Sequence, residues 1–359
     1  MSRFVILVLF FFVLVRPLFV IIFHNPFLIW VSLEVGTFSV VPLLFLKGSS
    51  RRVEASLKYF VIRITSSLVF LFGNVLSFHN VFFFEFFLRE LGKKKRMGFG
   101  VSLFFIYLPL LVKLGIFPFH FWFPEVVKGV GFLEGLILST VQKISPLYLI
   151  YIIKRGLFKI DFIFLVGSLS VLVGGWGGLN QTQIRKMMGF SSVSFMGWLF
   201  CLRGEASFYP LLYLFITYFF VSGSLFFFFY YTHLIGLSHL NKVVFFPVFV
   251  GFLTIGFFSL IGIPPFGGFS LKLFPFFSLF KSKNIFLLLL VFVPGTLFSL
   301  FFYLRLLFNL CFLIPPVRIK TFFFFRTKAA DNFLFSYLLG WVFSGSIFLF
   351  CFFDVIYFI

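Results

Sequence analysis

The chain has 359 residues, of which 61% are hydrophobic and only 11% are charged, with a formal net charge of +20 at pH 7. A soluble domain carries about 25% charged residues, so most of this chain does not face water. The excess basic residues form short clusters between apolar runs, such as residues 93–96, which is typical of loops beside a membrane and argues against a nucleic-acid partner.

Apolar runs of about 20 residues recur along the whole length, and each is long enough to cross a bilayer as a helix. The runs lack the two-residue alternation of barrel strands, so helices are the remaining way to satisfy the backbone in lipid. We therefore predict an all-α polytopic membrane protein, a single transmembrane domain over residues 1–359 with about eleven spans. They are expected near residues 4–23, 26–46, 57–78, 97–117, 132–153, 160–178, 187–202, 207–231, 243–280, 285–311 and 333–354.

The first run begins at Phe4 and is followed directly by a second span, so it is interpreted as a span and not as a cleaved signal. The lack of a targeting segment fits synthesis inside an organelle. The 71 phenylalanines follow no helical face and indicate a small organellar genome. Charge in the loops sets the orientation only weakly.

The ninth predicted span, 243–280, is too long for one crossing and is expected to be broken. It contains Ile263-Pro264-Pro265-Phe266-Gly267-Gly268, and the two prolines remove two backbone donors. Such a break persists at membrane depth only where it faces protein or a water-filled cavity. A kink is also expected in the fourth span, which carries Pro109 and is followed by Pro118.

Four ionisable residues lie inside or beside predicted spans: Glu34, Lys113, Lys143 and Lys272. A charge at mid-bilayer costs about 2.5–3.5 kcal/mol or more, so such residues usually face the bundle interior and have a partner. One alternative is that each lysine extends to the membrane interface. The other is a proton relay, in which Glu34 and Lys113 form an ion pair that opens and closes.

Other polar residues have simpler interpretations. Arg16, Arg63 and Arg305 lie near predicted span ends or next to proline, where long basic side chains reach the interface. Glu125 and Glu134 flank an interfacial segment and are expected at helix starts. The histidines near an interface are interpreted mainly as structural, with a relay function as the alternative: His120, His233 and His239.

The three cysteines are far apart and form no metal-ligand spacing, which predicts small buried side chains at Cys201, Cys311 and Cys351. The chain also lacks a Rossmann glycine fingerprint and cluster-ligand cysteines. We therefore expect it to bind no metal and no cofactor.

Several motifs in chain order resemble the subunit 2 family of respiratory complex I, NADH:ubiquinone oxidoreductase. The resemblance covers roughly residues 26 to 310, and its most specific run is Trp-Gly-Gly-Leu-Asn-Gln-Thr-Gln at 176–183. The matching segments are Trp30 to Glu34, Lys58-Tyr59-Phe60, Lys113 to Glu125, Gln142-Lys143-Ile144, Gly174 to Lys186, Ser191-Ser192, Met196-Gly197-Trp198, Gly262 to Phe269 with Lys272, and Tyr303-Leu304-Arg305.

The resemblance implies an antiporter-like, proton-translocating subunit of the mitochondrial inner membrane. By that resemblance Glu34 and Lys113 match the modulating pair, Lys143 the central lysine, and Lys272 the lysine that leads toward the exit. NADH, FMN, iron–sulfur clusters and ubiquinone would then be bound by other subunits, and this chain alone would carry no redox centre. Its implied partners are other membrane-arm subunits, including antiporter-like neighbours, and lipids, with cardiolipin as a candidate.

Three positions depart from the family pattern. Gly36 stands where the family usually has asparagine, Arg63 where glutamine is common, and Phe195 where a histidine often precedes Met-Gly-Trp. Pairing of Arg63 with Glu34 is one hypothesis that follows, and loss of the histidine removes an imidazole link near Lys143. Two rival functions stay open, a free-standing cation/proton antiporter and a non-pumping structural spacer of the membrane arm.

Overall fold

The computed structural model describes residues 3–46, 48–87, 97–153, 160–202, 208–232, 234, 236–237, 247–263, 266, 268–269, 272–273 and 291–312. Within these ranges the ordered elements are helices, apart from an isolated bridge between Gln183 and Gly236. This confirms the all-α prediction. The chain divides into two compact units, Met1–Val166 and Gly167–Ile359. One domain over residues 1–359 stays a prediction.

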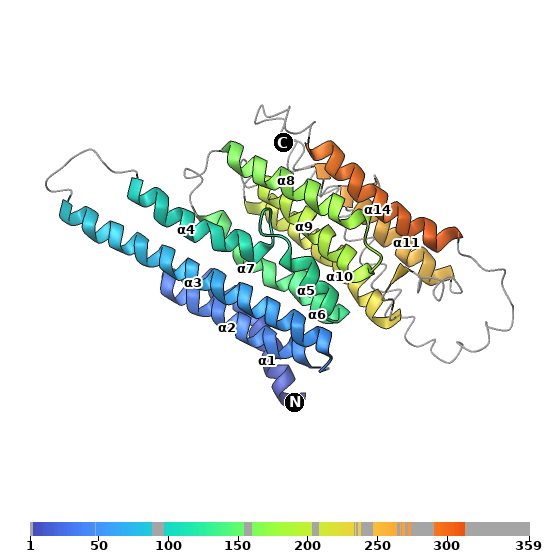
Figure 1. Ribbon diagram of the computed structural model, residues 1–359, viewed down its shortest axis with the longest axis horizontal. Coiled ribbons are helices and arrows are strands. Elements are labelled where there is room, and N and C mark those ends of the chain that lie inside the picture. The colour runs from blue at the N-terminus through green and yellow to red at the C-terminus, as the bar shows by residue number, and fades with distance from the viewer. Residues whose placement is uncertain are drawn as a thin grey trace. The chain divides into compact units, whose positions relative to one another are not determined.

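In the part that the structure describes, the first unit holds seven complete helices and the start of an eighth. The seven are α1 (Arg3–Ile22), α2 (Pro26–Phe45), α3 (Ser50–Phe87), α4 (Met97–Leu114), α5 (Trp122–Gly129), α6 (Phe132–Ser139) and α7 (Val141–Ile152). Helix α2 packs between α1 and α3, and α4 packs along the other side of α3 (Figure 1). Helix α7 packs against both α1 and α4, so the start of α7 faces the interior of this unit.

The second unit begins within α8 (Ile160–Leu179) and contains α9 (Ile184–Leu202), α10 (Phe208–Thr232), α11 (Pro247–Ile261) and α14 (Val293–Phe312). Helices α8 and α9 approach closely at glycines. A Cβ atom at Gly174 would lie 2.6 Å from the Ser194 backbone nitrogen, and one at Gly197 would lie 2.7 Å from the Gly167 carbonyl oxygen. Small residues of this kind let helix backbones come together where lipid gives no hydrophobic drive.

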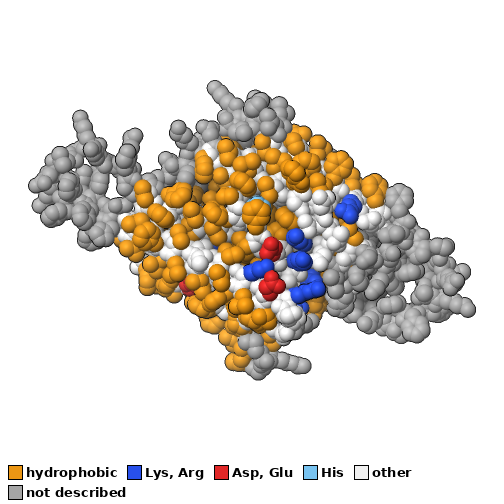
Figure 2. All heavy atoms as spheres, in the orientation of Figure 1, with side chains coloured by type: hydrophobic (Ala, Val, Ile, Leu, Met, Phe, Trp, Pro, Cys, Tyr) orange, Lys and Arg blue, Asp and Glu red, His pale blue; other side chains and the backbone are white. Residues whose placement is uncertain are grey.

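Six of the described helical segments are long and apolar enough to cross a membrane: Phe4–Ile22, Pro26–Phe45, Ser50–Phe78, Phe132–Ile152, Phe162–Leu179 and Leu211–Thr232. Large apolar side chains such as Phe4, Leu7 and Phe11 are exposed on the surface of α1. On the face drawn in Figure 2, hydrophobic side chains cover most of the described surface, and charged ones gather in a small area.

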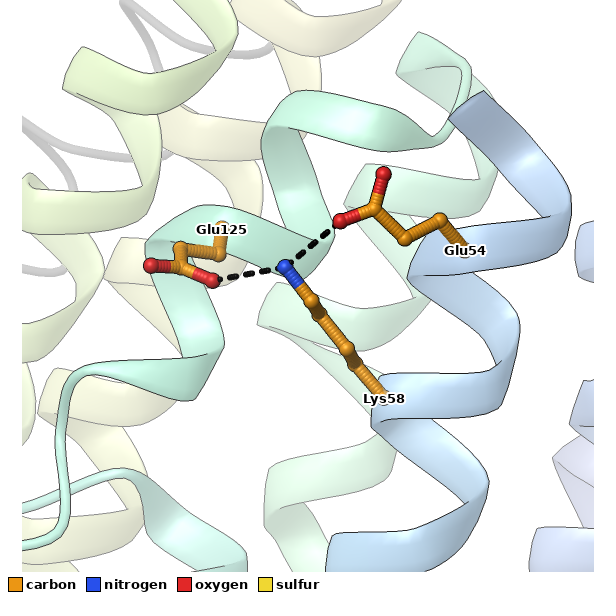
Figure 3. A network of polar contacts seen from close by, with 3 residues as sticks. All are labelled: Glu54, Lys58 and Glu125. Atoms are coloured by element: carbon orange, nitrogen blue, oxygen red, sulfur yellow. Dashed lines mark hydrogen bonds and ion pairs between the residues drawn. The ribbon is translucent and has the colours of Figure 1, made fainter. Parts of the chain in front are cut away.

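Ion pairs at the N-terminal end of α3 mark one edge of the first unit. Lys58 lies 2.7 Å from Glu54 and 3.1 Å from Glu125 of α5, as Figure 3 shows. Arg52 lies 3.2 Å from Glu134 of α6. Both Glu125 and Glu134 occupy the first turn of their helices, as predicted. The Lys58 pairs are exposed, as is typical of a water interface, and add little stability, whereas the Arg52–Glu134 pair is half-buried.

Two helices end at a glycine with a left-handed backbone. Helix α4 ends before Gly115 (φ +70°), and α11 ends before Gly262 (φ +79°). At both ends the next residue's N–H bonds back five residues, Ile116 to Leu111 at 3.2 Å and Ile263 to Phe258 at 3.3 Å. This Schellman pattern satisfies the terminal carbonyls. The end of α11 at Ile261 confirms the predicted break in the segment 243–280.

A second interruption, at Thr140, was not predicted. Thr140 (φ −116°, ψ −80°) separates α6 from α7, and its hydroxyl donates to the Leu136 carbonyl at 2.7 Å. Proline at position 146 has no N–H to give to the carbonyl of residue 142 and crowds it, which weakens the ladder at the same point. Lys143 therefore lies in the first turn of a half-helix and not in the middle of a continuous span.

Candidate functional site

Among the described residues of the first unit, four cationic side chains are buried. Arg16 and Arg63 are 1% exposed, Lys113 is 1% exposed and Lys143 is fully buried. They come from α1, α3, α4 and α7, and Glu34 of α2 lies among them, half-buried. Burying charge is costly unless partners compensate, so this concentration makes the interior of the first unit the candidate functional region.

The predicted interface positions of Arg16 and Arg63 are wrong. Both guanidinium groups point into the helix bundle because α1 and α3 turn these faces toward α2, α5 and α7. Arg63 lies over two aromatic rings, 5.2 Å from the Tyr59 centroid and 5.5 Å from the Trp122 centroid. Arg305 differs: it is exposed and donates to the Leu179 carbonyl at 2.9 Å.

Glu34 is held by hydroxyl groups. Its Oε2 accepts a hydrogen bond from Thr37 Oγ1 at 2.9 Å, and its Oε1 accepts one from Ser67 Oγ of α3. Among the described residues the ion pairs involve neither Glu34 with Lys113 nor Glu34 with Arg63. The expected direct pairs are thus absent from this conformation. The Glu34 charge still attracts Arg16 and Lys113 through space.

Lys113 lies in the last turn of α4, one residue before the terminal Leu114. The negative end of the helix dipole favours a cation there. Its Nζ lies 5.9 Å from the Phe70 ring centroid and has no hydrogen-bond partner among the residues that the structure describes. Arg63 and Arg16 repel its positive charge, while Glu34 attracts it.

Lys143 is surrounded differently, although it is also buried. Its Nζ lies 4.1 Å above the Phe123 ring centroid, which is a close cation–π contact. The preceding residue, Gln142, accepts hydrogen bonds at Oε1 from Arg16 Nη1 and, at 3.4 Å, from the Tyr59 hydroxyl. Through Gln142, the start of α7 is therefore bonded to Arg16 of α1 and to Tyr59 of α3.

Lys272 belongs to the second unit. Its Nζ donates to the Ile261 carbonyl at 2.6 Å, at the C-terminal end of α11. A Cβ atom at Gly262 would lie 3.0 Å from Lys272 Cδ, so the glycine leaves room for the lysine stem. The predicted exposure of backbone dipoles at this break is confirmed. Lys113 and Lys272 thus share one arrangement, a lysine at a helix C-terminus closed by a left-handed glycine.

The remaining predicted polar residues are less central. His120 is buried, its ring centroid lies 3.9 Å from that of Phe121, and burial lowers the pKa of the imidazole. Phe195 stacks on Tyr218 with ring centroids 3.8 Å apart, so an aromatic contact replaces the family histidine. His233, His239, Cys351 and the side chain of Cys311 lie outside the described residues, and Cys201 is buried as predicted.

Sequence reasoning missed the contribution of five residues to this region: Arg16, Thr37, Tyr59, Ser67 and Gln142. Tyr59 and Gln142 belong to recognised motif segments, so a signal was present without an assigned contact. The signal for Arg16 was indirect, because it is the missing side chain at Gly36 that leaves room for it. Ser67 and Thr37 carried no signal that distinguishes them from other hydroxyl residues in spans.

Comparison with known proteins identifies relatives over most of the chain. Residues 24–299 match the family described as NADH:quinone oxidoreductase/Mrp antiporter, TM. A protein of Patiria pectinifera named NADH-ubiquinone oxidoreductase chain 2 is 38% identical over 331 residues, which is 91% of this chain and 90% of that protein. One of Pisaster ochraceus with the same name is 37% identical over 310 residues, 86% of this chain and 85% of that protein.

Solved structures share the fold. A chain of respiratory complex I from Thermus thermophilus with bound aureothin aligns with TM-score 0.74 and 22% identity, covering 86% of this chain and 71% of that one. A chain of the membrane-bound sulfane sulfur reductase, an archaeal respiratory membrane complex, aligns with TM-score 0.77 and 19% identity, covering 96% and 73%. The antiporter-like fold predicted from the sequence is therefore confirmed.

Proposed function

Because the chain belongs to the NADH:quinone oxidoreductase/Mrp antiporter family, we infer that it is a proton-translocating subunit of the membrane arm of NADH:ubiquinone oxidoreductase, respiratory complex I. It takes part in that enzyme as one component of the complex. Electron transfer from NADH to ubiquinone takes place in other subunits, which carry the FMN and iron–sulfur clusters. The chain lies in the mitochondrial inner membrane and contacts other membrane-arm subunits, antiporter-like neighbours and lipids, with cardiolipin as a candidate.

The observation that carries this proposal is the buried cluster of Glu34, Lys113 and Lys143 within one helical unit. A cation at membrane depth is retained where it faces the bundle interior and has a task. Glu34 is bound to hydroxyls in this conformation. A movement of its carboxylate toward Lys113 would strengthen proton binding by the lysine, and a movement away would weaken it. Lys113, Lys143 and Lys272 exchange protons in sequence with hydrated paths toward the two sides of the membrane.

Each lysine has a local environment suited to its part. Lys272 donates to a carbonyl at the end of α11, where the helix dipole stabilises the charged form, and Lys113 lies in the last turn of α4 with its Nζ near the Phe70 ring. Lys143 lies at the start of α7, where the positive end of the dipole opposes its charge and the Phe123 ring supports it. Motion of the helix ends would change how strongly the charged form of each lysine is stabilised, and a proton would then move from one lysine to the next.

Replacement of the central lysine tests this function. We expect Lys143→Ala in the assembled complex to slow ubiquinone-coupled proton pumping by roughly a hundredfold, since a proton-transfer group is removed. Oxidation of NADH with an artificial acceptor at the peripheral arm should continue. The measurements are the pH change outside proteoliposomes and NADH oxidation with ferricyanide.

The matched control is Lys128→Ala, because Lys128 is an exposed lysine at the end of α5, away from the cluster. It should pump like the unmodified complex. Normal pumping by the Lys143→Ala complex would contradict the proposed relay and favour a structural spacer.

A further inference from the structure

Arg16 enters the bundle through a space that exists because residue 36 is glycine. A Cβ atom at Gly36 would overlap Arg16 Cδ and would lie 2.5 Å from its Nε and 2.9 Å from its Cγ. The stem of the arginine therefore fills the volume that any side chain at position 36 would occupy. Gly36 has an ordinary helical backbone, so room for Arg16, and not conformational freedom, is what the glycine provides.

Beyond Gly36, the guanidinium reaches the start of α7. Its Nη1 donates to Gln142 Oε1, which is fully buried and also accepts from the Tyr59 hydroxyl at 3.4 Å. A hydrogen bond to a charged group is stronger than a neutral one, especially where water is excluded. Among the described residues, Arg16 Nε and Nη2 have no partner, so Gln142 is its principal anchor.

The start of α7 follows a kink, so contacts from other helices are needed to fix its position. The kink at Thr140 interrupts the helix, so the first turn of α7 lacks a continuous ladder before it. Gln142 and Lys143 are adjacent in that turn, and fixing the amide of one residue restricts the backbone that carries the other.

We propose that Arg16 is a positioning residue of the relay, which orients Lys143 by anchoring Gln142, and that Gly36 is the position that admits it. This inference rests on the proposed pumping function and deepens it. The arginine touches neither a substrate nor a cofactor, and it acts through the first turn of α7. The interface interpretation of Arg16 fails because its side chain is 1% exposed.

The first experiment replaces Arg16 in the assembled complex. Arg16→Met keeps an apolar stem as far as the position of Nε but removes the charge and the hydrogen bond, and we expect about tenfold less pumping per NADH oxidised, as for loss of a charge-assisted bond. Arg16→Lys keeps a cation that can still donate to Gln142 and should recover much of that loss. Arg51→Met, which removes an exposed arginine at the start of α3, is the control and should pump normally.

The second experiment is a double-mutant cycle between the two positions. Gly36→Ala alone should reduce pumping as Arg16→Met does, because the new methyl group displaces the arginine stem. In an Arg16→Ala background, the same glycine change should have no further effect, since the space is then empty. Gly251→Ala is the matched glycine control, because a Cβ atom there meets nothing within 4 Å.

The outcomes separate this inference from the function beneath it. Loss of pumping in Lys143→Ala with unchanged pumping per assembled complex in Arg16→Met would overturn the positioning role and leave the relay intact. Additive effects of the Gly36 and Arg16 changes would overturn the link between them. Normal pumping in Lys143→Ala would instead overturn the proposed function itself.

Discussion

Hydroxyl groups hold the Glu34 carboxylate in this conformation, so the proposed relay does not depend on a direct ion pair between Glu34 and Lys113. Ser67 and Thr37 each donate to one oxygen, so the acid is satisfied without a direct contact with Lys113. Its charge nevertheless acts on Arg16 and Lys113. Opposite charges attract over several ångströms when water is scarce, so a direct bond is not needed for coupling.

Neutralising this acid should therefore disturb the whole cluster. We expect Glu34→Gln to reduce pumping by at least about tenfold, because the amide keeps hydrogen-bonding atoms but offers no negative charge to the nearby cations. The measurement is proton uptake per NADH oxidised in proteoliposomes. Glu54→Gln is the control, since Glu54 is an exposed acid on α3 (Figure 3). Equal pumping by both variants would argue that Glu34 is only structural.

At the scale of single helices, interruptions place the ionisable groups. Lys113 and Lys272 each lie beside a helix end closed by a left-handed glycine, and Lys143 follows the kink at Thr140. In a continuous helix the backbone carbonyls are bonded within the helix, so none is free to interact with a side chain. The two glycine ends thus offer carbonyl groups to a nearby ammonium, whereas the kink before Lys143 presents the opposite end of a helix dipole.

Gly262 gives a direct test of this arrangement. Gly262→Ala should lower the stability of the complex by about 1–2 kcal/mol, because an alanine is strained at a φ of +79°. It should also disturb Lys272, whose Cδ lies 3.0 Å from the new Cβ atom. Thermal unfolding and pumping are the two measurements. With Gly251→Ala as control, unchanged values in both would show that the break tolerates a side chain.

At the scale of the whole molecule, the composition and the exposed apolar side chains indicate a protein that is embedded in a membrane. Large apolar side chains such as Phe4 and Phe121 are more than 70% exposed, which a water-facing surface would not favour. Lipid or neighbouring subunits can cover them. The exposed ion pairs of Lys58, Glu125 and Glu54 mark one edge of the first unit as a water interface (Figure 3).

Exposed apolar faces fit both a complex subunit and a free-standing antiporter, so purification has to distinguish the two. For a subunit of complex I, we expect the chain to co-purify with NADH-oxidising activity through affinity purification and gel filtration after detergent extraction. A tag on a peripheral-arm subunit should retain it. Recovery of the chain alone, with cation/proton exchange in liposomes and no associated NADH oxidation, would support the antiporter.

The sequence by itself determined the membrane class, the helical fold and which ionisable residues lie within or beside apolar spans, because hydropathy and the cost of buried charge are local properties. It also predicted a break in the segment 243–280, since glycine and proline act on their own backbone, but it placed the break at residues 263–268, whereas α11 already ends at Ile261. Only the tertiary structure decided that Arg16 and Arg63 point inward, that hydroxyls hold Glu34 and that Thr140 kinks its span. Lipid and protein interior are equally apolar, so in helices that are hydrophobic on every side the inward face is chosen by packing against neighbours and not by composition.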